Sequence, residues 1–249
     1  MRLLLISDIH SNREALDAVL AEARRRGFDE ALCVGDIVGY YADPNYALDV
    51  VREMNAVTVL GNHDAAAISA LDNQSSFNTA VVGIVEWHQQ VITDEHKEWL
   101  RSLKYEVHHG DLYMMVHGTP RNFLEYLLSI PVAKASLQYL KEKICFVGHT
   151  HIPLVISATP GKDGPEFRAH AMRDDVNMYR LPKEAKLFVN PGSVGQPRDG
   201  IPKASFGIFD TIRNTIEVIR VEYDWVPTQE KVRQNGLPEA LATRLPLGR

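Results

Sequence analysis

Short apolar runs alternate with amphipathic segments in the first quarter of the chain. Runs typical of buried strands cover residues 2–7, 31–34 and 57–60. The segments between them, residues 12–26 and 45–54, carry apolar side chains at helical spacing, and Gly27 is expected to end the first helix. Strands that alternate with helices in this way favour parallel pairing with right-handed crossovers, so the sequence predicts an α/β fold.

The rest of the chain has a different pattern. Residues 65–103 contain no strand-like run and are expected to form two or three helices, with Trp87 and Trp99 as packing anchors. Further strands are predicted at residues 105–109, 112–116, 144–147, 153–157, 167–171, 186–189, 205–209 and 215–221, with a helix over 132–143. Residues 226–249 are expected to form a helical tail. No repeat or linker divides the chain, so one domain over residues 1–249 is predicted.

Five polar motifs each follow directly on an apolar run. They are Ser7-Asp8-Ile9-His10, Gly35-Asp36, Gly61-Asn62-His63-Asp64, His117-Gly118 and Gly148-His149-Thr150-His151. Open α/β sheets bind ligands beyond the carboxyl ends of their strands, and every motif lies at that end, so the motifs are expected to converge. In an extended strand end, the side chains of residues i and i+2 point to the same side. Two such pairs occur in the motifs, and both side chains of a pair are expected to reach the same ion. The pairs are Asp8 with His10 and His149 with His151.

The side chains of these motifs form a set of metal ligands. The set is Asp8, His10, Asp36, Asn62, His117, His149 and His151. Oxygen and nitrogen donors without thiolates suit Mn, Fe, Ni, Zn or Mg and disfavour an iron–sulfur cluster. Seven ligands exceed what one ion takes while keeping an open position, so two ions bridged by Asp36 are predicted. Each motif alone has an ordinary explanation as a turn, a cap or a core histidine, but the ordered set favours metal.

Composition and charge narrow the class of protein. The 249 residues are 45% hydrophobic and 24% charged, which is ordinary for a globular protein. A net charge of −5 gives no strong signal for binding a nucleic-acid polymer. No apolar stretch reaches the length of a membrane span and no signal peptide is evident, so a cytoplasmic location without membrane contact is expected. Cys33 and Cys145 lie in apolar runs and are interpreted as core residues.

In their order, the motifs closely resemble those of the calcineurin-like metallophosphoesterase superfamily. The segment Asn190-Pro191-Gly192-Ser193-Val194-Gly195 is similar to its small bacterial and archaeal phosphodiesterase branch. The resemblance implies a four-layer α/β/β/α sandwich, in which two packed mixed sheets are flanked by helices. The helical segment of residues 65–103 is expected to lie near the site. The resemblance implies a first ion held by Asp8, His10, Asp36 and His151. It implies a second ion held by Asp36, Asn62, His117 and His149.

The same resemblance implies catalytic roles beside Asp36. His63 would stabilise the transition state or protonate the leaving oxygen, a task suited to an imidazole with a pKa near neutrality. Asp64 is either the carboxylate that orients His63 or a plain turn residue. Many relatives have an acidic residue three positions after the bridging aspartate, and this chain has Gly39 there.

Four further residues are candidates for contact with substrate. Asn12 begins the first predicted helix and either meets a phosphate or only caps the helix. Tyr40 either stacks on a base or aryl group or packs in the core. Arg121 and Arg198 either contact a phosphate or lie on the surface without a role.

These inferences predict a metal-dependent phosphoesterase with a preference for phosphodiesters. Hydroxide held between the two ions is expected to attack phosphorus, and manganese is the favoured metal. The expected partner is a small phosphoester, with a nucleotide as one candidate, and the oligomeric state stays open. Phosphomonoesters, cyclic nucleotides and dinucleoside polyphosphates remain as alternative substrates. A non-catalytic protein-binding scaffold on the same fold and a dimetal hydrolase of another bond are the alternative functions.

Overall fold

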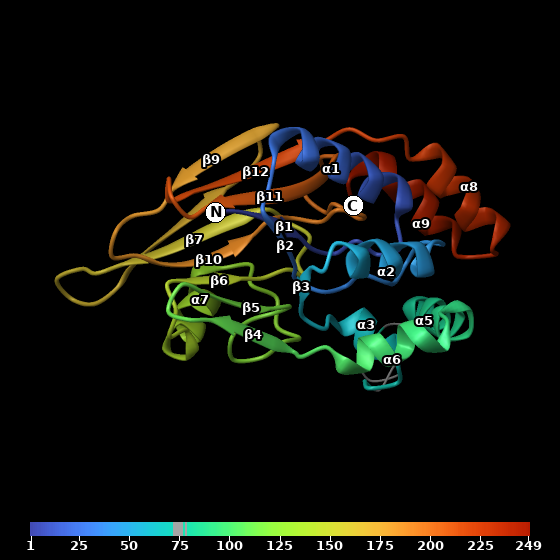
Figure 1. The fold of residues 1–249 in the computed structure, drawn as a ribbon, viewed down its shortest axis with the longest axis horizontal. Coiled ribbons are helices and arrows are strands. Elements are labelled where there is room, and N and C mark those ends of the chain that lie inside the picture. Colours follow the sequence, from blue (N-terminus) through green and yellow to red (C-terminus); the bar gives the residue numbers. More distant parts are fainter. Residues whose placement is uncertain (72–76, 78) are drawn as a thin grey trace.

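Two sheets packed face to face form the centre of the protein in a computed structural model that describes residues 1–71, 77 and 79–249 (Figure 1). Among these residues each sheet has six strands. The first runs β3 (Val57–Thr58), β2 (Glu30–Cys33), β1 (Arg2–Ile6), β11 (Ala204–Asp210), β12 (Thr215–Val221) and β9 (Val176–Arg180). The second runs β4 (Glu106–His109), β5 (Tyr113–Val116), β6 (Ile144–Phe146), β10 (Lys186–Asn190), β7 (Leu154–Thr159) and β8 (Glu166–Ala171).

Each sheet combines a parallel and an antiparallel part. The three strands β1, β2 and β3 pair in parallel, as the strand–helix alternation predicts. In the second sheet β5, β6 and β10 are parallel. All other pairs are antiparallel. The one strand the sequence did not predict, β9, is an edge strand whose side chains are exposed or half-buried, including Met178 at 66% exposure.

Alternating side chains of the strands fill three apolar layers. Leu3 and Leu5 of β1 face the space between the sheets, whereas Leu4 and Ile6 pack against helices on the outer side. Helices α1 (Arg13–Arg26) and α2 (Pro44–Glu53) cover the first sheet. Helix α7 (Ile130–Ser136) and the single turn η1 (Leu137–Tyr139) cover the second, where the sequence predicted one longer helix. The four-layer α/β/β/α sandwich is therefore confirmed, with mixed sheets as expected.

Two helical segments gather at one end of the molecule, on the right of Figure 1. The predicted helical insertion contains α3 (Asn62–Ala67), α5 (Thr79–Val91) and α6 (Asp94–Ser102), and part of its span lies outside the described residues. The C-terminal tail forms α8 (Val226–Gln234), α9 (Glu239–Arg244) and the turn η2 (Leu245–Leu247). A small apolar cluster joins the two segments through Ile84 of α5 and Leu241 of α9. Trp87 and Trp99 are half-buried against apolar clusters, so both are packing anchors.

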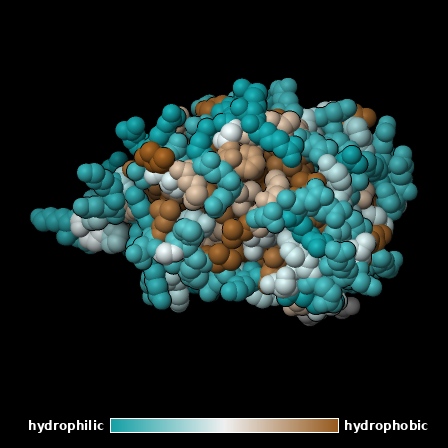
Figure 2. All heavy atoms as spheres, in the orientation of Figure 1, coloured by the Kyte–Doolittle hydropathy of each residue, from teal (hydrophilic) through white to brown (hydrophobic). Residues whose placement is uncertain are grey.

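The outer surface is mostly hydrophilic. Figure 2 shows polar and charged side chains over most of one face, with apolar side chains visible between them near the middle. The hairpin between β7 and β8 projects at the left and carries hydrophilic side chains at its tip. No helix within the described ranges is long and apolar enough to cross a membrane.

Candidate metal centre

The loops that carry the five motifs meet at the carboxyl ends of the parallel strands of both sheets. Two backbone hydrogen bonds of 3.0 Å, from Asp8 N to Gly35 O and from His10 N to Asp36 O, join the loops that follow β1 and β2. A 2.8 Å bond from Gly148 N to His117 O joins the loops that follow β5 and β6. The convergence expected from the topology is therefore found, and the site spans both sheets.

The backbone reaches this convergence by a different local geometry from the one the sequence suggested. The strands end before the motifs, and five ligand residues have left-handed φ angles: Asp8 (52°), His10 (50°), Asp36 (53°), His149 (66°) and His151 (60°). The expectation of extended i, i+2 pairs was wrong. Asp and His tolerate this conformation better than most residues, but each such residue still costs about 1 kcal/mol or more. Strain concentrated at the motifs indicates that side-chain placement there outweighs backbone preference.

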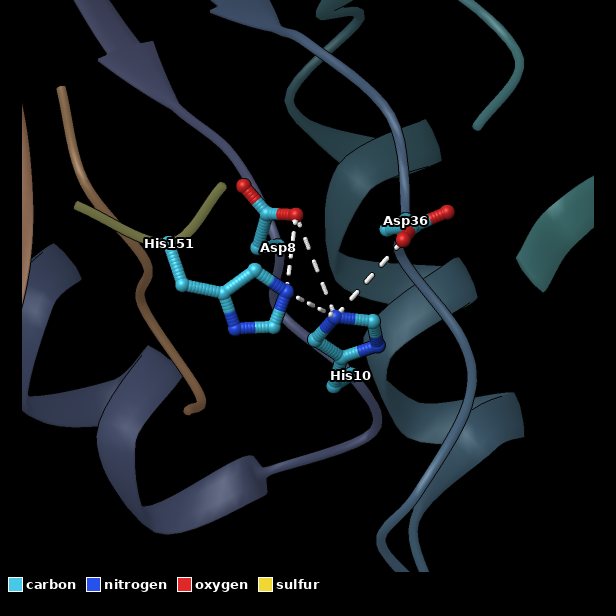
Figure 3. Close-up of side chains that lie close together, drawn as sticks. All are labelled: Asp8, His10, Asp36 and His151. Carbon is cyan, nitrogen blue, oxygen red and sulfur yellow. Dashed lines mark hydrogen bonds and ion pairs between the residues drawn. The ribbon is translucent and has the colours of Figure 1, made fainter. Parts of the chain in front are cut away.

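Two ligand groups share one carboxylate. In each group, one oxygen or nitrogen atom per residue lies within 4.8 Å of those of the others. The first group is Asp8, His10, Asp36 and His151, and the second is Asp36, His117 and His149. Figure 3 shows the first group, with the side chains pointing toward one another. Asn62 adds an amide oxygen to the second group, because its Oδ1 lies 3.1 Å from His117 Nε2. All seven predicted ligands are thus brought together and buried.

Backbone carbonyl groups fix the orientation of all four imidazoles. The contacts are His10 Nδ1 with Val38 O (3.0 Å), His117 Nδ1 with Val34 O (2.7 Å), His151 Nδ1 with Gln196 O (2.6 Å) and His149 Nε2 with Leu124 O (3.1 Å). A carbonyl only accepts, so each contact assigns a proton to the ring nitrogen that faces it. The opposite nitrogen of each neutral ring therefore presents a lone pair to the site, as metal-binding histidines do.

At two of the four rings, the lone pairs face one another without a proton between them. Nε2 of His10 and Nε2 of His151 are 3.0 Å apart, and both are acceptors in the assigned tautomers. Oδ2 of Asp36 is buried and lies 3.2 Å from Nε2 of His117, with which it forms an ion pair when that ring is protonated. Buried acceptors that converge in this way are unfavourable unless a cation lies among them. The donor set therefore fits divalent metal ions.

Burial and mutual charge set the protonation of the ligands. Burial lowers the pKa of His149 to about 3, and it lowers the pKa of His10 and His151 well below the ordinary value. Burial also opposes the charge on His117, but the carboxylate of Asp36 outweighs it and raises the pKa of His117 to about 9. Burial raises the pKa of Asp8 to about 7. Three of the four imidazoles are therefore neutral near pH 7, the form that binds metal.

His63 lies beside the candidate ligands, but no backbone carbonyl group of the described residues contacts its Nδ1. Its backbone N–H donates to Oδ1 of Asp36 at 2.8 Å, and its buried Nδ1 has no hydrogen-bond partner. Its ring centroid lies 4.5 Å from that of Tyr40 and 4.9 Å from that of His10. Burial lowers the pKa of His63 to about 4, so the expected pKa near neutrality is not found. His63 is therefore a neutral imidazole with an unsatisfied nitrogen at the edge of the metal site.

Asp64 has the role of a turn residue. Its Oδ1 accepts from Val38 N at 3.0 Å and its Oδ2 accepts from Gly61 N at 3.1 Å, so its carboxylate holds two loops together. It makes no hydrogen bond to His63, because the Nδ1 of that ring has no partner. Of the two alternatives for Asp64, the structure favours the turn.

A cavity of about 650 Å³ lies over the metal ligands. Five motif residues line it: Asp36, Asn62, His63, His149 and His151. The volume falls in the range of small-molecule sites. Two of the four predicted substrate contacts, Tyr40 and Arg198, also line this cavity.

The other two candidates lie elsewhere. Asn12 is fully buried, caps α1 through a 3.2 Å bond from Ala15 N, and donates to Gly195 O at 2.8 Å. Of the two alternatives for Asn12, the structure therefore supports helix capping. Arg121 forms an ion pair with Glu125 beside a separate depression and does not line the cavity. Its proposed phosphate contact is not supported, because its charge is already paired and lies outside the site.

Sequence reasoning missed several residues of the site. Tyr126 stacks on His149, with ring centroids 4.0 Å apart and planes 16° apart. Arg244 reaches the same cavity from the C-terminal tail. His88 of α5 is buried behind the site, where its Nε2 accepts from Gly39 N at 3.3 Å and contacts Ser11 Oγ at 3.2 Å. None of the three belongs to a motif, so only the folded chain places them there.

A buried cluster of Asp and His residues at the carboxyl ends of two packed mixed sheets, within an α/β/β/α sandwich, defines the class of metallophosphoesterases. The sequence matches the calcineurin-like phosphoesterase superfamily domain over residues 1–214, and the chain belongs to this family. The resemblance inferred from the motifs is thereby confirmed. Family and ligand groups together indicate a hydrolase that binds divalent metal ions.

Individual relatives agree with this assignment. The chain is 39% identical to an uncharacterised protein of Methanocaldococcus jannaschii over 250 residues, which cover 98% of this chain and 97% of the relative. The crystal structure of a metallophosphoesterase from Sphaerobacter thermophilus matches with a TM-score of 0.86 and 36% identity, over 100% of both chains. A hypothetical protein from Pyrococcus horikoshii shares the fold at a TM-score of 0.77 and 19% identity, over 100% of this chain and 98% of the other.

Proposed function

We propose that this protein is a dinuclear metal-dependent phosphodiesterase. The observation that carries the proposal is the shared carboxylate of Asp36, which belongs to both ligand groups. One ion would be held by Asp8, His10, Asp36 and His151, and the other by Asp36, Asn62, His117 and His149. When bound, two such ions activate water and neutralise phosphoryl charge.

The residues of this chain perform the remaining tasks. The carbonyl contacts hold each imidazole in one tautomer, so the ligands are oriented before substrate arrives. His63, whose ring lines the cavity, donates a hydrogen bond to the phosphoryl group or the leaving oxygen. Arg198 places a positive charge on the cavity wall, where an anionic ester would lie.

The experiment separates metal binding from catalysis. Chelator-treated protein is reconstituted with Mn, Ni, Zn or Mg and assayed on bis(p-nitrophenyl) phosphate, a diester, and on p-nitrophenyl phosphate, a monoester. Hydrolysis is expected only with metal, and the diester is expected to be the better substrate. Full activity after chelation, or a strong preference for the monoester, contradicts the proposal.

Three variants sharpen this test. Asp36→Asn is expected to lose both metal and turnover, because both ligand groups need this carboxylate. His63→Asn is expected to keep its metal content and lose about 100-fold or more in kcat, since His63 acts on substrate. His108→Gln, at a half-exposed imidazole of β4 paired with Glu142, is the matched control and is expected to change neither property. If His63→Asn also loses metal, His63 is a ligand and its assigned role is wrong.

A further inference from the structure

Two arginines, Arg198 and Arg244, line the cavity, and neither pairs with an Asp or Glu side chain among the described residues. Arg198 donates from Nε to Gln196 Oε1 at 3.1 Å and from Nη2 to Tyr40 Oη at 3.1 Å, so both partners are uncharged. The neighbouring carboxylate of Asp199 instead pairs with Arg220. Arg244 donates from Nε to the backbone oxygen of Arg249, and its terminal nitrogens bond to no described residue. Both guanidinium groups therefore keep donors for a ligand.

The two guanidinium groups are close enough to affect each other. Burial, together with the positive charge of Arg198, lowers the pKa of Arg244. Arg198 is half-buried and its charge reaches Asp8 and His63 at the metal site, and Arg244 lines the same cavity from the C-terminal tail. Two like charges close to each other destabilise each other, and a partly buried cation loses hydration. An anion between them would reverse both effects.

Several arginines elsewhere in the chain pair with a carboxylate. Arg121 pairs with Glu125, and Arg233 of the same C-terminal tail pairs with Glu239. Arg198 and Arg244 differ from these, because both line the cavity that the candidate metal ligands also line. Guanidinium groups bind phosphate through paired hydrogen bonds, so two of them side by side form a phosphate subsite.

The remaining wall of the cavity is apolar. It is formed by Leu71, Ile84 and Leu241, with the ring of Tyr126 at the edge. Tyr126 is 45% exposed and stacks on His149. An aromatic or apolar group of the substrate would bury its surface here, between the helical insertion and the C-terminal tail.

We propose that Arg244, together with Arg198, binds a second phosphate of the substrate, beyond the ester that is cleaved. The substrate class is then a phosphoester with an aromatic or apolar group and at least one further phosphate, as in a nucleotide with two phosphorylated positions. Arg244 is a specificity-determining residue supplied by the tail. This inference rests on the proposed phosphodiesterase function and names its substrate.

A matched pair of substrates tests the assignment. The p-nitrophenyl ester of thymidine 5′-phosphate has the ester to be cleaved, and its 3′-phosphorylated form adds only the second phosphate. Metal-reconstituted wild-type protein is expected to prefer the phosphorylated form. Arg244→Met is expected to lose about tenfold to 100-fold in kcat/KM on that form, mainly through KM, and less than about twofold on the other. Arg244→Lys should recover part of the loss, and Arg233→Met should change neither substrate.

Equal losses on both substrates, or no loss on either, overturn the proposal. A binding measurement keeps it testable without turnover. Calorimetry with thymidine 3′,5′-bisphosphate and metal-free protein is expected to show binding that Arg244→Met weakens about tenfold or more and Arg233→Met leaves unchanged. If metal-free wild-type protein does not bind the bisphosphate, the arginine pair is not a phosphate subsite. If binding depends on Arg244 but reconstituted protein cleaves neither ester, the phosphodiesterase function fails and the subsite stands.

Discussion

Gly39 is a position where a small substitution should have a specific effect on the site. A Cβ atom there would lie 2.6 Å from His63 Nδ1 and 3.0 Å from His10 Nδ1. To reach an ordinary contact of 3.4 Å, the His63 ring must move by roughly 0.8 Å.

The substitution Gly39→Ala combines this clash with backbone strain at a φ of +108°. Strain of this kind costs about 1–3 kcal/mol, and displacement of a catalytic group by about 1 Å costs about 100-fold in rate. We therefore expect Gly39→Ala to lower kcat on bis(p-nitrophenyl) phosphate by about tenfold to 100-fold. Steady-state kinetics on metal-saturated protein measures the rate, and thermal unfolding measures the stability.

Gly164→Ala is the matched control. Gly164 has a similar φ of +118°, but nothing lies within 4 Å of the Cβ that would be added. It should therefore show the backbone strain alone, as a fall in Tm of a few degrees, with kcat unchanged. If Gly39→Ala keeps wild-type kcat, or if Gly164→Ala loses as much, the argument that packing against Gly39 positions His63 is refuted.

Three other changes have definite expected outcomes. Arg121→Ala should leave kcat and KM within about twofold, because the side chain lies outside the cavity; a tenfold rise in KM would restore its phosphate role. His88→Leu removes the acceptor for Gly39 N, so it should lower kcat while leaving metal content unchanged; loss of metal in direct analysis would refute this. Burial raises the pKa of Glu14, but hydrogen bonds from Lys231 and Thr228 outweigh it and lower that pKa. Glu14→Gln should therefore cost about 1 kcal/mol at pH 7, a difference that should vanish in urea titrations as the pH falls below about 4.5.

The sequence predicted the convergence of side chains correctly where polar motif residues directly follow an apolar run. Each candidate metal ligand comes just after an apolar run, and strand ends in an α/β sheet have a fixed place, so convergence could be inferred without coordinates. The same logic could not give the backbone geometry. Asp8 and His10 adopt left-handed conformations that local preference disfavours and that the interlocked loops impose.

The sequence could not predict the residues that only tertiary packing brings to the site. Arg244 and His88 lie far along the chain from the motifs, on helices whose positions depend on packing between the insertion and the tail. Arg121 shows the converse error, since closeness to His117 in sequence did not place it in the cavity. The edge strand β9 was missed because its apolar and polar side chains are mixed and give no apolar run.

The central claim is that two ions share the carboxylate of Asp36. Anomalous diffraction from crystals of manganese-reconstituted protein tests it most directly. The account predicts two peaks roughly 3.5–4 Å apart, one on each side of Asp36, with Asp8, His10 and His151 around one and Asn62, His117 and His149 around the other. A single peak, or ions bound only outside these residues, would contradict it.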